Sequence, residues 1–180
     1  MKPLLALFAL FASPVIYKVE PAQTTVEYMV DSTLHAVHGT FALKRSALSI
    51  DPGNGRVEGE LAVDANSGAS GSEARDHRMT REILEATKYP EIVFQPDRFE
   101  GRLAAEGESH VALHGVLGIH GAQHEVVAQV DARAISGGYD AVAHFNIPYV
   151  DWGMKNPSTF ILRVNKVVQV TVHAVVHTAT

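Results

Sequence analysis

Most of this chain alternates apolar with polar residues, which is the period-two pattern of β-strands that bury one face. Residues 56–64 are typical, because Val57, Leu61 and Val63 share one face while charged side chains occupy the other. Turn-forming sequences such as DPGNG separate one alternating segment from the next. We therefore predict about eight to ten antiparallel strands. The expected ranges are 15–19, 25–31, 34–43, 47–50, 56–64, 92–94, 98–104, 110–119, 125–135, 139–147 and 159–177.

A sheet of this size has two exposed edges, and closing it into a barrel removes them. An eight-stranded barrel has an interior just wide enough for packed side chains or for one small ligand. Several of the positions expected to face inward are small, namely Ala128, Ala132, Ala134, Ala141, Ala143 and Gly59. The predicted fold is thus an all-β closed antiparallel barrel of about eight strands. Its interior is either an oily cavity or a core filled by bulky residues from facing strands.

One segment breaks the alternation and reads as a helix over residues 73–87. Met79, Ile83 and Leu84 give it an apolar face, and charged residues cover the remainder. Pro90 disfavours helical geometry in the residue before it, so the helix is expected to end near position 87. Such a helix would cover or plug the barrel.

Composition excludes several functions. The formal net charge of −5 argues against nucleic acid as a partner, because the surface would not neutralise phosphates. The sequence also has no cluster of lysine and arginine that would mark an anionic membrane as a partner. Cysteine is absent, which excludes disulfides, thiol catalysis and cysteine-zinc sites.

The first residues are expected to be a targeting segment. Lys2 is followed by a short apolar run over residues 4–12, which resembles a secretory signal peptide and is too short for a stable membrane anchor. The alternative is an apolar first strand of the mature fold. We expect residues 1–14 to be a signal peptide, residues 15–180 to form a single domain, and the product to be periplasmic or secreted.

The chain has ten histidines, and these raise the alternative of a metal-binding or haem-binding protein. Three pairs are four residues apart, but on a strand this spacing separates the Cα atoms by about 13 Å, too far to chelate one ion. His120 and His124 are the exception, because a turn is predicted between them. We predict no metal site and no cofactor. No catalytic motif is present either, so no catalytic residue and no enzyme activity are predicted.

Four short motifs carry a resemblance to a known family. They are V-H-G-x-F at 37–41, R-D at 75–76, K-Y-P-x-I-x-F at 88–94 and L-G-I-H-G at 117–121. Each is weak alone, but their combination resembles the YceI-like, polyisoprenoid-binding family of bacterial proteins over most of the chain.

The resemblance implies a lipocalin-like barrel, exported from the cytoplasm, with an elongated apolar channel. Members hold an isoprenoid chain, such as a quinone tail, or a fatty amide, and they have no general catalytic apparatus. A homodimer is also suggested by the resemblance. The sequence departs from the family at Arg78, where a histidine is common, and at 82–84, where Glu-Ile-Leu replaces Asp-Phe-Phe. Residues 151–158 match the family only loosely.

Strand phase and the helix face predict which residues form the channel. The expected wall consists of Tyr28, Phe41, Leu61, Ile83, Leu84, Phe94, Leu113, Phe145 and Val168. Candidates for holding a polar head group at the mouth are His38, Arg75, Asp76, Tyr89 and Trp152. The predicted function is to bind a polyisoprenoid or other long-chain amphiphile for transport, storage or sequestration. The alternatives are the histidine-based metal or haem protein and a filled barrel that acts through its exterior.

Overall fold

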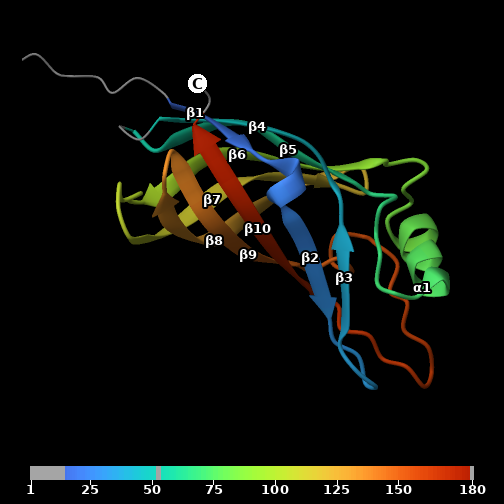
Figure 1. Cartoon of the computed structure of the whole chain (residues 1–180). Helices are drawn as coiled ribbons and strands as arrows, with labels where there is room; N and C mark the ends of the chain where they lie inside the picture. The colour runs from blue at the N-terminus through green and yellow to red at the C-terminus, as the bar shows by residue number, and fades with distance from the viewer. Residues whose placement is uncertain (1–14, 52–53, 179–180) are drawn as a thin grey trace, which may run out of the picture.

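The computed structural model of the protein describes residues 15–51 and 54–178. The predicted signal peptide, residues 1–14, therefore lies outside the described residues. Figure 1 shows strands wrapped into a barrel with one short helix at one end. The strands are β1 (Val15–Val19), β2 (Thr25–Val30), β3 (Val37–Phe41), β4 (Leu43–Asp51), β5 (Arg56–Asp64), β6 (Glu91–Gly101), β7 (Glu108–Ile119), β8 (Ala122–Ile135), β9 (Gly138–Ile147) and β10 (Val168–Thr178).

The sheet closes on itself as an antiparallel barrel with eight positions, as predicted. Its order is β1-β4-β5-β6-β7-β8-β9-β10, and β1 pairs back with β10. β1 and β2 follow one another along β10, separated by a 3₁₀ turn at Pro21–Gln23, so together they fill one position. β3 and β4 share the next position in the same way, because β3 pairs with β2 and β4 pairs with β1.

Three strand predictions are corrected. Residues 92–94 and 98–101 belong to one strand, β6, whose pairing with β7 is irregular between Pro96 and Arg98, and residues 102–104 lie beyond its end. A proline cannot donate to the ladder, so the sequence reads as a break where the strand has only a bulge. Likewise the strands expected at 34–43 and 47–50 are β3, which begins later and ends earlier than expected, and β4, which begins earlier and ends later, so residues 34–36 lie in no strand.

The largest correction concerns residues 159–167, which were expected to begin the last strand but form part of a loop. Their apolar content favours a strand, but side chains occupy two backbone amides that a ladder would need. The Val164 amide donates to Ser158 Oγ at 2.9 Å, and the Val167 amide donates to Asn165 Oδ1 at 3.2 Å. β10 therefore begins at Val168.

The helix lies where it was predicted but is shorter. α1 (Glu73–Arg78) continues as one π-helical turn, η2 (Met79–Ile83), in which the Leu84 amide donates to the Met79 carbonyl at 2.9 Å. Glu85 then adopts a left-handed conformation with φ of 48°, which ends the helix. Within the described residues, no helix is both long and apolar enough to cross a membrane.

The interior is divided into two halves. At one end a core cluster of Val19, Leu48 and Val57 is packed against neighbours such as Phe99 and Val176. At the other end nine buried residues form a ring of side chains beneath the helix: Val26, Leu84, Leu117, Ile119, Val126, Ile147, Tyr149, Met154 and Val170. The first half is filled, and the second surrounds an open space.

Candidate functional site

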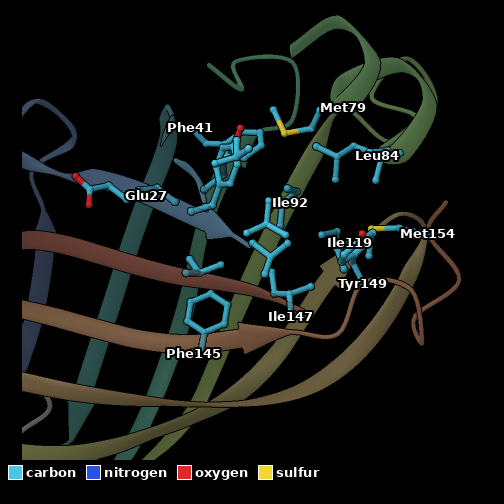
Figure 2. A pocket seen from close by; sticks show the side chains of 18 of the residues that line it. Glu27, Phe41, Met79, Leu84, Ile92, Ile119, Phe145, Ile147, Tyr149 and Met154 are labelled. Atoms are coloured by element: carbon cyan, nitrogen blue, oxygen red, sulfur yellow. The ribbon is translucent and has the colours of Figure 1, made fainter. Parts of the chain in front are cut away.

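A cavity of about 600 Å³ occupies the second half of the barrel, and all nine residues of the larger core cluster line it. Figure 2 shows Met79 and Leu84 from the helical segment facing the same space as Phe145 and Ile147 from β9. A volume of this size falls within the range of small-molecule sites in proteins. An oily cavity is therefore present in one half of the barrel. Of the six small residues expected to face inward, however, only Ala128 and Ala143 line it, and Gly59 is exposed.

Three leucines form the boundary between the hollow half and the filled half. Leu43, Leu61 and Leu113 line the cavity and also pack against the smaller core cluster. Because solid packing lies beyond them, the cavity is closed at this end. The sequence allowed two alternatives for the interior, an oily cavity and a filled core. The structure has both, each in one half of the same barrel.

The structure brings all nine predicted wall residues together in the lining of this cavity. These are Tyr28, Phe41, Leu61, Ile83, Leu84, Phe94, Leu113, Phe145 and Val168. Sequence reasoning missed Tyr149 and Met154, which lie in the connection between β9 and β10, where no periodicity marks a face. The Met154 amide donates to the Tyr149 carbonyl at 3.0 Å, and this turn directs both side chains inward.

The polar residues of the lining come from β2, from the β2–β3 turn and from α1 with its N-cap: Glu27, Ser32, His35, Ser72, Arg75 and Arg78. We call the part of the lining formed by the turn and α1 the mouth. Apart from two tyrosines, the remaining lining residues are apolar. An amphiphile would therefore find its apolar surroundings inside and its polar partners at the mouth.

Tyr28 places a hydroxyl group inside this otherwise oily wall. Its side chain is only 8% exposed, and burial is the main cause that raises the pKa of its phenol. The hydroxyl lies near Ser70, but it makes no hydrogen bond of normal geometry to any described residue. Ser70 is itself engaged, because its hydroxyl accepts from Arg75 Nε at 2.7 Å and donates to the carboxylate of Asp76. Tyr28 thus keeps an unused hydrogen-bonding group, but its oxygen is itself buried, so a ligand would reach it only after neighbouring side chains move.

Of the predicted head-group residues, Arg75 lines the cavity and the other four do not. Asp76 holds Ser70, as described above. His38 is exposed, because it alternates on β3 with Val37, which faces inward. Trp152 stacks on the ring of His124, with centroids 3.9 Å apart and planes 3° from parallel.

Tyr89 lies outside the cavity lining and connects two of the sequence motifs, its own at 88–94 and the one at 117–121. Its ring packs against His120 at a centroid distance of 5.2 Å and lies over Gly121, in the β7–β8 turn. His120 Nε2 also lies 2.6 Å from Glu85 Oε2 at the end of the helical segment. These contacts, which we call the latch, fasten the helical segment to the barrel wall.

The latch and the wall explain two motif glycines. A Cβ at Gly121 would lie 2.4 Å from the Tyr89 ring, and φ at this residue is 76°. A Cβ at Gly39, in the V-H-G-x-F motif, would lie 2.5 Å from the Tyr28 ring. Each glycine therefore leaves room for a tyrosine, which a reading of strand phase does not detect.

Several histidines make local contacts at separate places in the molecule. His110 pairs with Asp131, His114 with Glu100 and His144 with Thr171. Within residues 15–51 and 54–178, no three histidine or carboxylate side chains are arranged to hold a metal ion.

Comparison with known proteins agrees with this architecture. The crystal structure of BcnA from Burkholderia cenocepacia is similar with a TM-score of 0.70 and 17% identity, covering 91% of this chain and 100% of that one. A polyisoprenoid-binding domain from Saccharophagus degradans, implicated in plant cell wall breakdown, is similar with a TM-score of 0.68 and 14% identity, covering 92% and 99%. A YceI protein from Campylobacter jejuni is similar with a TM-score of 0.56 and 15% identity, covering 100% and 94%.

Sequence comparison supplies the family. None of the curated proteins matches the chain in sequence. The sequence model of the YceI-like domain family, however, matches residues 17–176. This range includes every strand except the ends of the first and the last. The chain therefore belongs to the YceI-like family.

Proposed function

We propose that this protein is an exported carrier that holds a polyisoprenoid, such as a quinone-like tail, or another long-chain amphiphile inside its barrel. Transport, storage or sequestration of that lipid would be its role. The observation that carries the proposal is the hollow, apolar half of the barrel. The structural similarity to a polyisoprenoid-binding domain supports it, and so does the predicted signal peptide for the export.

The size of the cavity suggests how much of a lipid it holds. At roughly 30 Å³ per water-sized group, 600 Å³ accommodates about twenty heavy atoms, or about four five-carbon isoprenoid units. Burial contributes about 0.8 kcal/mol per carbon, so each unit gives a gross gain of about 4 kcal/mol. Several units together would offset the cost of association, about 4 to 15 kcal/mol.

The first prediction concerns the bound molecule. Native mass spectrometry of protein purified from a lipid-containing host is expected to show a bound lipid, identified after extraction. In a titration series, affinity should rise with each isoprenoid unit and level off near about four units, because the three leucines close the cavity. Protein that yields no lipid and gives no site for a fluorescent apolar probe would contradict the proposal.

The second prediction concerns the head group, which we place at the mouth beside Tyr28 and Arg75. Tyr28→Phe is expected to weaken binding of an amphiphile with a hydrogen-bonding head by roughly 3- to 10-fold. A hydrocarbon of the same length should bind unchanged. Unfolding should be unaffected or slightly harder, because the lost hydroxyl has no partner of normal geometry among the described residues.

Tyr149→Phe provides a matched control for this change. Tyr149 also lines the cavity, but its hydroxyl donates to the Asn165 carbonyl at 3.0 Å. This variant should lose about 1 kcal/mol of stability and keep its discrimination between head groups. If Tyr28→Phe leaves both ligands with equal affinity to the parent, the head group lies elsewhere.

A further inference from the structure

Two turns beside the mouth expose large apolar side chains. One is residues 32–35, between β2 and β3, and the other is residues 159–162, in the connection between β9 and β10. Leu34, Phe160 and Ile161 are 71%, 95% and 83% exposed, the highest values among large apolar side chains of the described residues. We call these three side chains the apolar tip. In Figure 1 both turns lie toward the end of the barrel that carries α1.

Backbone hydrogen bonds hold the two turns side by side. The Thr33 amide donates to the Arg163 carbonyl at 2.9 Å, and the Asn165 amide donates to the Asp31 carbonyl at 2.8 Å. An antiparallel bridge between Ser32 and residue 164 lies between these bonds. Segments far apart in sequence are therefore joined by a short ladder, and the grouping of their apolar side chains is built into the fold.

The second turn directs its apolar side chains in two directions. The Thr159 amide donates to the Leu162 carbonyl at 2.8 Å, and the Leu162 amide donates to Thr159 Oγ1 at 3.0 Å. Leu162 lines the cavity, while the two residues before it are exposed to solvent. Leu34 both lines the cavity and is exposed. The tip is thus continuous with the cavity wall.

The shape and charge of the tip indicate what covers it. Scattered apolar side chains on a surface are normal, but three grouped on neighbouring turns are a contact feature. A stable protein interface needs roughly 800 Å² from each partner, far more than three side chains on two projecting turns provide. A bilayer needs no matching surface, and projecting aromatic and aliphatic side chains enter its interfacial layer readily.

Charge favours the same partner. Arg163 and Lys166 are exposed beside the tip, and neither makes an ion pair with a described residue. Asp31 is the one acidic residue in segments 31–35 and 158–167, although the whole chain has a net charge of −5. The tip is therefore a locally basic, apolar point on an acidic protein. With only two cations, its attraction to anionic lipid adds to apolar insertion and does not replace it.

We infer that the apolar tip inserts into the interface of a phospholipid bilayer and sets the mouth of the cavity against the membrane. Lipid could then pass between bilayer and cavity without crossing water, and this consequence rests on the proposed carrier function. The docking itself depends only on the tip.

Vesicle co-sedimentation tests the inference. The probes are vesicles of phosphatidylcholine alone and vesicles with equal parts of phosphatidylcholine and phosphatidylglycerol. The parent protein is expected to bind both, and the mixed vesicles more tightly. A double variant with Phe160→Ser and Ile161→Ser should bind about ten-fold more weakly to both. Replacing Arg163 and Lys166 by glutamine should remove the preference for phosphatidylglycerol.

The matched control replaces Val127 and Ile135 by serine, since these side chains are 45% and 38% exposed on β8 and belong to no turn beside the mouth. This control should bind vesicles as the parent does. Equal vesicle binding by the tip variant and the parent would overturn the inference. A parent protein that binds no vesicles would also overturn it. So would a parent that self-associates instead of binding vesicles, if Phe160→Ser with Ile161→Ser abolishes the self-association.

A fluorescent apolar probe, titrated without vesicles, separates this inference from the carrier proposal. The tip variant should bind the probe with parental affinity, because its replaced side chains do not line the cavity. Vesicle binding without any probe binding would leave the docking in place and contradict the carrier function. Probe binding without vesicle binding would leave the carrier function in place and contradict the docking.

Discussion

Ala128→Phe is expected to lower the affinity for an isoprenoid ligand by about a thousand-fold. Ala128 is 3% exposed on β8, lines the cavity and pairs with Leu113 at its closed end. A phenyl ring there occupies the space of roughly one isoprenoid unit, whose burial is worth about 4 kcal/mol. The measurement is titration with a chain of four isoprenoid units and with one of two.

The length of the isoprenoid ligand gives this prediction its second part. A two-unit chain fits in the space that remains, so its affinity should fall much less than that of the four-unit chain. Thermal unfolding should be unchanged or shifted upward, because the ring fills a void and does not displace packed neighbours. A large loss of stability would instead mean that the interior around Ala128 is already full.

Gln129→Phe provides the matched control. Gln129 follows Ala128 on the same strand and is exposed on the outer face of the barrel. The variant adds the same ring to the same strand without entering the cavity, so ligand affinity should match that of the parent. If both variants weaken binding equally, the effect comes from disturbance of β8 and the cavity is not the binding site.

How much of this arrangement the sequence predicts depends on periodicity. Alternation along a strand assigns each side chain to one face, which is why Phe41, Leu61 and Phe145 could be placed in one wall from sequence alone. The same rule should have excluded His38, because its neighbour Val37 faces inward. Strand phase therefore identifies the wall, and a motif match without phase does not identify the mouth.

Periodicity fails where the chain leaves regular structure. Phe160 and Ile161 read as the start of a strand, but side-chain hydrogen bonds around them shape a turn and leave both exposed. Met154 and Tyr149 enter the cavity from the same connection, and no repeat marks them. Contacts between distant segments, such as those of the latch, are equally invisible to a reading of single elements.

Gly121→Ala is expected to destabilise the protein by about 2 to 5 kcal/mol. Two costs add at this position. A left-handed conformation with φ of 76° costs an alanine about 1 to 2 kcal/mol, and overpacking costs about 1 to 3 kcal/mol because the new Cβ would lie 2.4 Å from the Tyr89 ring. For a chain of this length, the melting temperature should fall by roughly 4 to 20 °C.

Gly71→Ala separates these two costs. Gly71 has nearly the same backbone conformation, with φ of 78°, but nothing lies within 4 Å of an added Cβ. It should therefore show the conformational cost alone, and the difference between the two variants reports the contact with Tyr89. If Gly71→Ala and Gly121→Ala destabilise equally, the close approach to the ring has no energetic weight.

Combining Gly121→Ala with Tyr89→Ala tests whether the latch is the source of the second cost. Removing the ring gives the new methyl group room, so the double variant should be less destabilised than the sum of the two single changes. The latch fastens the helical segment that supplies Met79, Ile83 and Leu84 to the cavity. Loosening it should therefore also speed ligand release, measured by displacement of a fluorescent apolar probe. Additive stability effects with unchanged release would show that the helical segment is held by its buried apolar face and not by the latch.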